Sequence, residues 1–310
     1  MGSSGVKIAN IDNMTYAANI SLNKVFENAG VSNYHLDIQS KEIVDVLYDF
    51  QPDKIINFAA ESHVDRSISN PDIFIKTNVF GTYNLLNCAL SYWERKGKSE
   101  KENFLFFHIS TDEIYGSLLP DAPSSLETDC IRPSSPYSAS KASSDCLVNA
   151  WNVTYGLPAI ITNCTNNYGP YQAREKLIPT VITNALENKK IPIYGDGKQI
   201  RDWLFVEDHI SAILNVIVNG VKGEKYNIGS NTELTNIELT KNLLFRLSQK
   251  TGAPYKSYEK LIEFVDDRPG HDIRYSLDTS KIRKEMNWSP QTDLNEGLDK
   301  TIAWILSQRG

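Results

Sequence analysis

The chain has 310 residues, of which 41% are hydrophobic and 23% are charged, so it is long enough for one large α/β domain or two closely associated ones. These figures argue against disorder. The formal charge of −6 and the pI near 5.5 argue against a protein whose main partner is nucleic acid or an anionic membrane, and small-molecule chemistry fits better.

No apolar run is long enough to span a bilayer, and the opening residues 1–5 lack the charged region and long apolar core of a signal peptide. We therefore expect a cytoplasmic protein. The four cysteines are scattered with no close CxxC pair. That spacing predicts neither a disulfide framework nor a bound metal.

Short apolar runs alternate with amphipathic stretches in the first part of the chain. Residues 6–11 and 54–60 are predicted strands, and residues 43–47 belong to a predicted helix between them. Residues 78–93 repeat apolar side chains at helical intervals, with Gly97 just beyond as a stop. This alternation is the βαβ signature of a parallel sheet, so we expect an α/β fold.

Residues 104–109 form a nearly continuous apolar run, which is typical of a central parallel strand covered on both faces. Ligands bind outside the carboxyl ends of the strands in such sheets, so residues 110–113 are expected to face a crevice. A helix is predicted to begin at Ser134–Pro136 and to run to Asn152. Residues 159–163 are another predicted buried strand.

Tyr137 and Lys141 lie four residues apart on that predicted helix, so their side chains share one face. The Lys141 ammonium is expected to stabilise a phenolate, to lower the pKa of Tyr137 and to let it exchange a proton with a sugar hydroxyl. A hydrogen bond from Thr111 could hold the same oxygen. Such a unit suits the oxidation of an alcohol by hydride loss to a nicotinamide, although a YxxxK spacing alone is a weak pattern.

The adjacent carboxyl groups of Asp112 and Glu113 suggest a second reaction. Elimination of water needs one group to take a carbon-bound proton and another to protonate the leaving hydroxyl. Neighbouring titratable groups are pushed apart in pKa, which favours a neutral Asp112 as the acid and an ionised Glu113 as the base. The alternative is that both residues belong to a solvated turn or a helix cap, which is the commoner fate of such a pair.

Six segments of the sequence, in order, resemble those of one enzyme family. They are AAESHVDRS at 59–67, HISTDEIYG at 108–116, SSPYSASKASSD at 134–145, TNCTNNYGP at 162–170, QIRDW at 199–203 and DRPGHD at 267–272. The match, which runs from about Val6 to the C-terminus, is with the dTDP-glucose 4,6-dehydratases, a family of extended short-chain dehydrogenases/reductases. The Asp-Glu pair after the threonine separates this family from the related sugar epimerases and decarboxylases.

The resemblance implies bound NAD and a homodimer that acts on a nucleotide sugar such as dTDP-glucose. Tyr137 would take the proton of the C4 hydroxyl while hydride leaves C4. Glu113 would remove the C5 proton, and Asp112 would protonate the departing C6 hydroxyl. Hydride would then return to C6, which gives a 4-keto-6-deoxy sugar nucleotide for deoxysugar synthesis. The implied catalytic residues are Thr111, Asp112, Glu113, Tyr137 and Lys141.

The resemblance also implies two sets of contacts. The NAD contacts fall on Asp12, Thr15, Asp37, Ile38, Ala59, Ala60, Ser62, Thr77, Tyr137, Lys141 and Asn167. The substrate contacts fall on Ser62, Thr111, Asn166, Lys176, Leu177, Tyr194, Arg201, Asn236, Arg268 and His271.

Three of these residues also have a physical rationale of their own. A carboxylate at the end of the second strand of a Rossmann fold, here Asp12, can accept both ribose hydroxyls of NAD and repels the extra phosphate of NADP. The alternative is that Asp12 caps the polar stretch that follows it. The guanidinium groups of Arg201 and Arg268 match a diphosphate.

Members of the family begin with a strand and a GxxGxxG turn, whereas residues 6–12 match the family's second strand. We therefore expect a Rossmann-type doubly wound parallel sheet from which the first βα unit is missing, because residues 1–5 have no preceding strand and no following helix. An incomplete record, a fragment in use and a natural variant that binds NAD weakly all stay open. We favour truncation of an ordinary dehydratase, since every downstream catalytic residue is present.

Residues 1–168 are expected to form the NAD-binding domain, to which 203–224 return, and 169–310 mainly a smaller substrate-binding domain. The family pattern places the dimer interface on the helices bearing residues 83–93 and 137–151. Two alternatives stay open. One is a dehydratase or epimerase of another nucleotide sugar, and the other is a non-catalytic, NAD-poor paralogue that binds nucleotide sugar.

Overall fold

The computed structural model describes residues 5–20 and 22–309. The elements of its first half are β1 (Ala9–Asp12), α1 (Leu22–Asn28), β2 (Ser32–His35), α2 (Ile43–Phe50), β3 (Lys54–Asn57), α3 (Val64–Ser69), α4 (Pro71–Phe74), the π-helix η1 (Ile75–Gly81), α5 (Thr82–Glu94), α6 (Lys98–Asn103), β4 (Leu105–Thr111), the 3₁₀ turn η2 (Asp112–Tyr115), α7 (Pro136–Tyr155) and β5 (Ala159–Cys164).

The second half brings shorter strands between longer helices. Its elements are β6 (Asn166–Tyr168), α8 (Leu177–Leu186), β7 (Ile191–Tyr194), β8 (Ile200–Phe205), α9 (Val206–Asn219), β9 (Lys225–Ile228), β10 (Glu233–Thr235), α10 (Asn236–Thr251), α11 (Tyr255–Glu259), β11 (Ile262–Val265), α12 (Ser280–Met286) and α13 (Leu294–Ser307).

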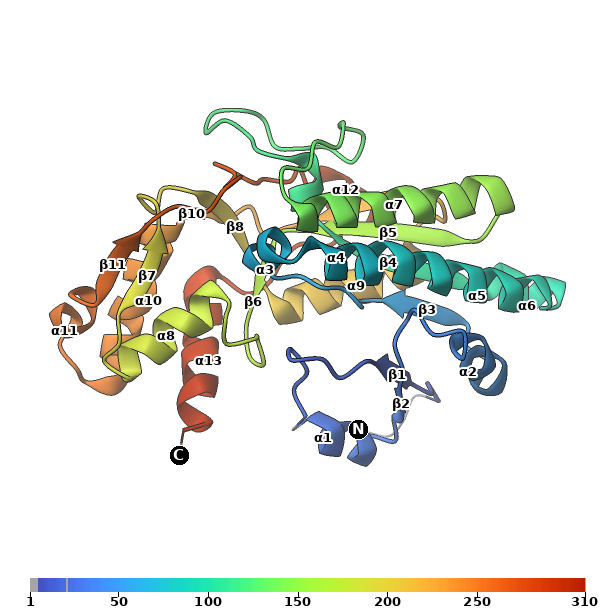
Figure 1. Ribbon diagram of the computed structural model, residues 1–310, viewed down its shortest axis with the longest axis horizontal. Coiled ribbons are helices and arrows are strands. Elements are labelled where there is room, and N and C mark those ends of the chain that lie inside the picture. The colour runs from blue at the N-terminus through green and yellow to red at the C-terminus, as the bar shows by residue number, and fades with distance from the viewer. Residues whose placement is uncertain (1–4, 21, 310) are drawn as a thin grey trace.

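Four parallel strands in the order β3-β4-β5-β9 form the central sheet (Figure 1). Along β4, successive side chains point to opposite faces. Phe106 packs in the cluster under α2, α5 and α7, whereas Phe107 packs in the cluster under α9 and α12. Both faces of β4 are therefore covered, which explains its apolar run and confirms the predicted α/β fold with a parallel sheet.

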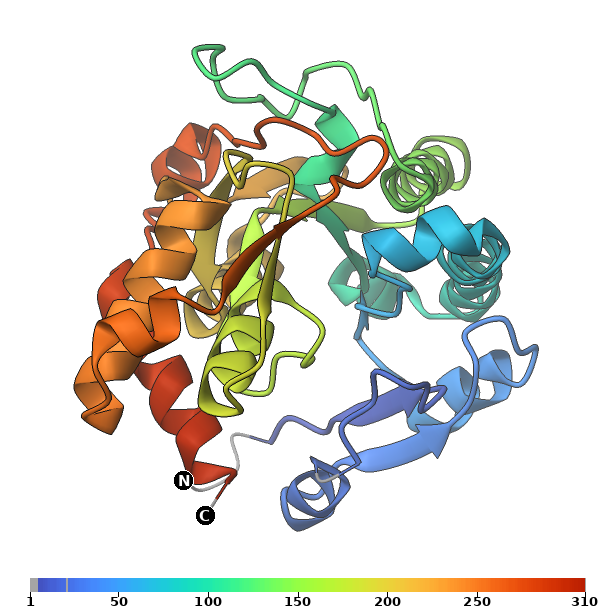
Figure 2. The same cartoon turned by 60° about the vertical axis from the view of Figure 1, so that its left-hand side comes forward.

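The strands β1 and β2 are parallel and form a separate two-stranded sheet. In the described residues, no strand pairs with β3 on the side away from β4, so the β-structure is divided between β1 and β3. The first residue along the described chain that is less than 9% exposed is Ile38, and the β1–α1–β2 unit lies at the margin of the molecule (Figure 2). The gap between β1 and β3 lies where the family's first strand is expected. The opening stretch, residues 1–5, is the one expected not to form the glycine-rich turn. Its residues 1–4 lie outside the described residues.

A second group of elements packs beside the central sheet (Figure 2). The strands β10-β8-β6 form one small sheet and β11-β7 another, and helices α8, α10 and α13 pack with them around one apolar core. Helix α9 leads back from β8 to the central sheet, where β9 adds its fourth strand. Strand β6 follows β5 of the central sheet, and strand β8 follows β7 of the second group. Because β6 and β8 are parallel neighbours, the two groups meet along these two strands.

One local prediction was wrong. Gly97 does not stop the predicted helix of residues 78–93, because α5 already ends at Glu94. Gly97 instead caps the start of α6, where its N–H donates to Glu100 Oε2 at 3.0 Å. The preceding π-helical turn η1 also shifts the start of regular α-helix to Thr82.

Candidate active site

The candidate catalytic carboxyl groups follow the end of β4. Thr111 is the N-cap of η2, and its Oγ1 accepts a hydrogen bond from the Glu113 N–H at 3.3 Å and donates one to Asp112 Oδ1 at 3.1 Å. Gly116 then ends the turn with a φ of 80°, in the left-handed region that favours glycine. Asp112 is 3% exposed, so the pair does not form the solvated turn that was the alternative.

The two carboxyl groups differ in their electrostatic surroundings. Burial, and then the charge of Glu113, raises the pKa of Asp112 to about 8, so Asp112 is mainly protonated at neutral pH. Burial also raises the pKa of Glu113, but the charges of Arg201, Arg268 and Lys176 oppose that rise. The environment therefore supports the predicted neutral acid at Asp112 and gives Glu113 three cations that favour its ionised form.

Helix α7 carries Tyr137 and Lys141 in its first two turns. Its start is set by the Ser135 side chain, which accepts from the Ser138 N–H, and by a proline at its first position. Lys141 Nζ donates to the carbonyl oxygen of Ile109 on β4 at 2.7 Å. Tyr137 and Lys141 are 9% and 4% exposed, so the helix buries both beside the strand that ends in Thr111.

The predicted lowering of the Tyr137 pKa by Lys141 was wrong. Burial, and then the charge of Glu113, holds the pKa of Tyr137 well above its usual value. Burial likewise lowers the pKa of Lys141. The physical reason is that the low-dielectric surroundings disfavour both charged forms more than their spacing on the helix favours them.

Three cations reach this site from other elements. Arg201 on β8 is 5% exposed, donates from Nη2 to the Asp272 carbonyl at 3.0 Å and lies 4.2 Å over the Tyr275 ring. Arg268 donates from Nη1 to Asp65 Oδ1 at 3.2 Å. Lys176 donates from Nζ to the Ser62 carbonyl at 2.9 Å. Arg201 thus faces the carboxyl groups from a buried position, whereas Arg268 and Lys176 are only partly buried.

Tyr194 and His271 lie together at the rim of this group. The Tyr194 hydroxyl donates to Asp65 Oδ2 at 3.0 Å, so Asp65 joins Tyr194 to Arg268. The His271 ring meets the Tyr194 ring edge-on, with centroids 6.3 Å apart, and His271 Nδ1 lies 2.6 Å from Asp267 Oδ1. Three predicted substrate residues are therefore brought together by contacts of their own.

The remaining predicted substrate residues stand at the starts of elements. Asn166 opens β6, Leu177 opens α8 and Asn236 opens α10, and all three are partly buried. Asn166 Oδ1 is buried without a hydrogen-bond partner among the described atoms, as is Asn167 Oδ1 next to it. A buried acceptor of this kind favours a ligand that donates a hydrogen bond there.

The predicted adenosine contacts lie at the carboxyl ends of β1 and β2. Asp12 Oδ1 accepts from the Met14 N–H at 2.6 Å, which is the capping role named as the alternative, and Asp12 and Thr15 are exposed. Asp37 accepts from Asn13 Nδ2 at 2.7 Å, and Ile38 beside it is 7% exposed. One oxygen of Asp12 thus stays available to a ribose.

The predicted nicotinamide-side residues follow β3. Ala59 and Ala60 are partly buried, Ser62 is exposed, and Thr77 is partly buried in η1. These residues, with Tyr137, Lys141 and Asn167, are the set predicted to contact the nicotinamide end of NAD. The described residues contain no glycine-rich turn that leads from a strand into a helix, so the pyrophosphate has no such cradle among them.

Two further side chains of the site were missed. The Tyr275 hydroxyl donates to Asp272 Oδ2, and its oxygen lies 3.4 Å from Glu113 Oε2. Asp65 holds Arg268 and Tyr194. Asp65 could have been predicted, because it lies in the segment 59–67 that resembles the family. Nothing local in the sequence indicates Tyr275.

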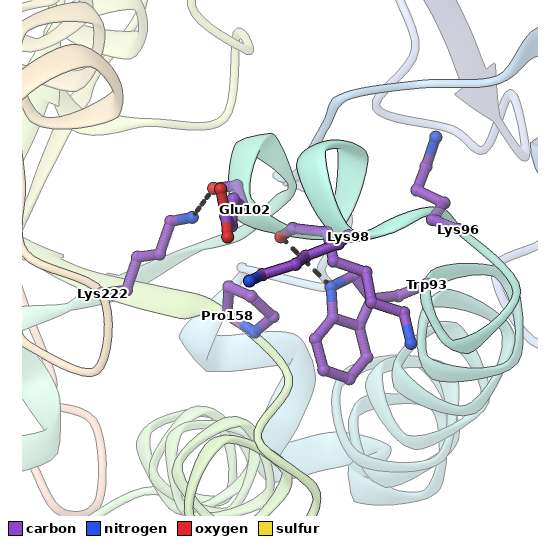
Figure 3. A pocket seen from close by; sticks show the side chains of 7 residues that line it. Trp93, Lys96, Lys98, Glu102, Pro158 and Lys222 are labelled. Atoms are coloured by element: carbon purple, nitrogen blue, oxygen red, sulfur yellow. Dashed lines mark hydrogen bonds between the residues drawn. The ribbon is translucent and has the colours of Figure 1, made fainter.

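A hollow of about 540 Å³ lies at the opposite ends of the central strands (Figure 3). Its lining residues are Trp93, Lys96, Lys98, Lys101, Glu102, Pro158 and Lys222. Pro158 precedes β5, whereas the catalytic candidates follow β4, so the hollow is separate from the candidate active site. Lys222 Nζ donates to the Glu102 carbonyl, and Trp93 Nε1 donates to the Lys101 carbonyl at 3.3 Å. These contacts satisfy carbonyl groups in the last turn of α6, a structural role.

Comparisons with known proteins agree with this geometry. The chain is 50% identical to a dTDP-glucose 4,6-dehydratase of Neisseria meningitidis, over 97% of the chain and 86% of that protein, and 51% identical to one of Haemophilus influenzae, over 96% and 90%. The structure matches that of DesIV, a dTDP-glucose 4,6-dehydratase of Streptomyces venezuelae with NAD and TYD bound, at a TM-score of 0.87 and 42% identity, covering 98% of this chain and 88% of that one. A family model described as GDP-mannose 4,6 dehydratase matches residues 2–301, so the chain belongs to that family, in the group of the dTDP-glucose 4,6-dehydratases.

Proposed function

We propose that this protein is an NAD-dependent dTDP-glucose 4,6-dehydratase, which oxidises, dehydrates and reduces one sugar to give dTDP-4-keto-6-deoxyglucose. The observation that carries the proposal is the pair of carboxyl groups after β4. Burial raises the pKa of Asp112 to about 8, and it raises the pKa of Glu113 too, but there three cations oppose the rise, so Asp112 is the better proton donor and Glu113 the better proton acceptor. The identity to dehydratases of this substrate names the sugar nucleotide.

NAD is the cofactor, and when bound it takes up a hydride from the sugar and later returns it. Asp12, Thr15, Asp37 and Ile38 would hold its adenosine. The nicotinamide end would be held by Ala59, Ala60, Ser62, Thr77, Tyr137, Lys141 and Asn167. The described residues do not provide the glycine-rich turn that commonly receives the pyrophosphate at a helix N-terminus.

Each catalytic side chain has one task. Tyr137 takes the proton of the C4 hydroxyl as a phenolate, a form that the Lys141 ammonium must favour against the burial that raises the Tyr137 pKa, and Thr111 holds the oxygen. A ketone at C4 acidifies the C5 proton, which Glu113 removes. Asp112 protonates the C6 hydroxyl as it leaves as water. When the hydride returns to C6, Glu113 gives its proton back to C5. C4 stays a ketone, so the proton on Tyr137 passes through solvent to Asp112, which restores both groups. This division follows the different surroundings of the two carboxyl groups.

The substrate contacts divide between the sugar and the nucleotide. Asn166, Lys176, Leu177, Tyr194, Asn236 and His271 complete the substrate set with Ser62, Thr111, Arg201 and Arg268. Because Arg201 is buried against Tyr275 and Arg268 is partly exposed, Arg268 is the better placed of the two to pair with the diphosphate.

The test is mass spectrometry of dTDP-glucose incubated with the purified chain and added NAD. The expected product is lighter by one water, and Glu113→Gln should abolish it. An epimerase needs no base at C5, so product of unchanged mass that persists in Glu113→Gln would support the epimerase alternative. Binding of dTDP-glucose with no product and no bound NAD would support the non-catalytic paralogue.

We also infer a division into an NAD-binding part, residues 1–168 with 203–224, and a mainly substrate-binding part, residues 169–310. The apolar core shared by α8, α10 and α13 supports this division. We place the enzyme in the cytoplasm, since its four cysteines are free thiols, as a reducing compartment keeps them. No helix of the described residues is long and apolar enough to cross a membrane.

We propose a homodimer formed through α5 and α7. These helices pack against each other and present aromatic side chains, with Tyr83 and Trp151 edge-on at 5.7 Å and Tyr83 46% exposed. Val153 is 74% exposed on the same helix as Trp151. Sedimentation should give twice the mass of the chain, and Tyr83→Asp should give the mass of one chain. An unchanged mass for Tyr83→Asp, or a monomeric unsubstituted chain, would contradict this interface.

A further inference from the structure

A buried polar network lies behind the catalytic end of β4. His108 on β4, Asp145 on α7 and Asn163 on β5 are each no more than 1% exposed. Removing a charged carboxylate from water costs several kcal/mol unless a partner compensates. None of these three residues has a part in the reaction as described so far.

Hydrogen bonds fix the orientation of the His108 ring. Asn57 Oδ1 accepts from the Ala59 N–H at 3.1 Å, which turns Asn57 Nδ2 toward His108 Nδ1 at 3.2 Å. Since Nδ2 can only donate, His108 Nδ1 accepts, and the proton of the neutral ring is on Nε2. Burial lowers the pKa of His108, which keeps the ring neutral. Nε2–H therefore faces Asp145 Oδ1, 3.5 Å away.

Asp145 Oδ1 and His108 Nε2 face each other without forming a hydrogen bond, whereas the other Asp145 oxygen is held by one. Asp145 Oδ2 accepts from Asn163 Nδ2 at 3.1 Å, and the same amide nitrogen donates to the Thr111 carbonyl at 3.2 Å. The contact with His108 lowers the pKa of Asp145 even though burial raises it. Asp145 is therefore a buried anion tied to the backbone of Thr111.

Lys141 is the cation nearest to Asp145 along α7, one helical turn before it, and both side chains are buried, but the ammonium and the carboxylate form no direct ion pair. Its ammonium donates to the Ile109 carbonyl at 2.7 Å. Burial lowers the pKa of Lys141, and the charge of Asp145 opposes that shift. The titratable groups that face this pair are His108 on β4, Cys164 on β5, Tyr115 on η2 and Tyr137 on α7.

We propose that Asp145 is a positioning residue, the buried counter-charge that keeps Lys141 an ammonium, and that His108 and Asn163 hold it in place. Lys141 then carries its charge into the site whenever Tyr137 takes a proton. This role deepens the proposed function, on which its consequence for catalysis rests. The proposed effect of the buried Asp145 charge on Lys141, called the pairing below, does not depend on that function, so the two can fail separately.

The first measurement is the pH dependence of Lys141 acetylation by trace acetic anhydride, followed by mass spectrometry of the peptide that carries Lys141. It requires no turnover. Asp145→Asn and Asp145→Ser remove the charge and should move the midpoint for Lys141 down by about one pH unit or more. In the same variants the acidic limb of kcat should move to higher pH, with KM for dTDP-glucose unchanged.

Two variants separate charge from packing. Asp145→Glu keeps the carboxylate and should leave the Lys141 midpoint within about a third of a unit of the unsubstituted chain. His108→Gln keeps a neutral side-chain donor and should do the same. Circular dichroism and thermal melting identify which variants fold. A folded Asp145→Asn or Asp145→Ser chain is enough to decide between an effect of charge and an effect of packing.

An unmoved Lys141 midpoint in a folded Asp145→Asn or Asp145→Ser chain would overturn the proposal. Loss of fold in all three Asp145 variants would also overturn it, in favour of a packing role. A shifted midpoint in a chain that yields no product from dTDP-glucose would retain the pairing and reject only the proposed function.

Discussion

The Tyr275 hydroxyl oxygen lies 3.4 Å from Glu113 Oε2, across 162 positions of sequence. The same ring lies under the Arg201 guanidinium, and the single proton of the hydroxyl is donated to the nearer Asp272. Tyr275 therefore connects the proposed base to the cation that favours its ionised form.

Tyr275→Phe is expected to lower kcat about tenfold, with little change in KM, because the polar hydroxyl beside Glu113 is lost and the ionised form of Glu113 is then less well stabilised. The loss should also move the acidic limb of the kcat profile to higher pH. Steady-state kinetics across pH measures both. Tyr258→Phe is the matched control. The Tyr258 hydroxyl lies 3.0 Å from Thr251 Oγ1 in the second core, the apolar core around α8, α10 and α13. Equal effects of the two substitutions would assign the loss to general destabilisation.

Asp112 should give the alkaline limb of the activity profile. Its pKa is about 8, and it can protonate the departing hydroxyl only in its neutral form, so kcat should fall as the pH rises through about 8. Asp112→Asn should lower kcat by a factor of about 10² to 10⁴ and remove this limb. An alkaline limb that persists in Asp112→Asn would assign the ionisation to another group.

The same substitution should stabilise the fold. The pKa of Asp112 is about 8 in the folded chain and has its ordinary value of 3.8 in the unfolded chain, so ionisation favours the unfolded chain increasingly between these values. Asn has nearly the shape of the neutral acid and does not ionise. Asp112→Asn should therefore raise the free energy of unfolding by roughly 1 to 4 kcal/mol at pH 7. Urea unfolding at pH 7 and pH 4 tests this, since the gain should nearly vanish at pH 4.

Asp145→Asn is the control of opposite sign. The pKa of Asp145 is lowered in the folded chain, so its ionisation stabilises the fold above the unfolded value, and that stability is lost as the pH falls through the folded value. The substitution should destabilise the chain at pH 7. If both substitutions changed the unfolding free energy in the same direction, the assigned protonation states would be wrong.

Local patterns were enough to predict β4 and α7. A continuous apolar run predicted a strand covered on both faces, and the four-residue spacing of Tyr137 and Lys141 predicted a shared helix face. The polar residues after β4 followed from the rule that parallel strands bind ligands at their carboxyl ends. These predictions depend on residues that are neighbours in sequence.

The rest of the site depends on distant contacts. No pattern near Tyr275 indicates that it reaches Glu113, because the two meet only when the second core packs beside the central sheet. The Tyr137 pKa was predicted in the wrong direction since burial, a sum over the whole fold, dominates the effect of the nearby Lys141. Spacing along a helix indicates which groups are near each other but not how much water they lose.

Gly116 is the residue whose substitution should damage the turn of Asp112 and Glu113 most directly. Its φ is 80°, and a Cβ there would lie 2.2 Å from the Arg132 carbonyl oxygen, while the Arg132 N–H donates to the Ile114 carbonyl at 2.9 Å. Gly116→Ala must therefore strain the backbone and also displace either Arg132 or η2. We expect a loss of about 3 kcal/mol in unfolding free energy, and kcat should fall because η2 holds both carboxyl groups.

Gly252→Ala isolates the conformational part of that cost. Gly252 has a φ of 73° after α10, and a Cβ there would meet nothing within 4 Å. Its substitution should lower the free energy of unfolding by about 1 to 2 kcal/mol, the cost of a left-handed backbone at a residue with a Cβ. It should leave kcat unchanged, because Gly252 shares only this backbone cost with Gly116. Urea unfolding and kcat, measured on both variants, separate the two terms. The two variants could instead lose equal amounts of unfolding free energy and keep their kcat. That result would mean that the segment at Arg132 moves aside without cost and does not hold the catalytic turn in place.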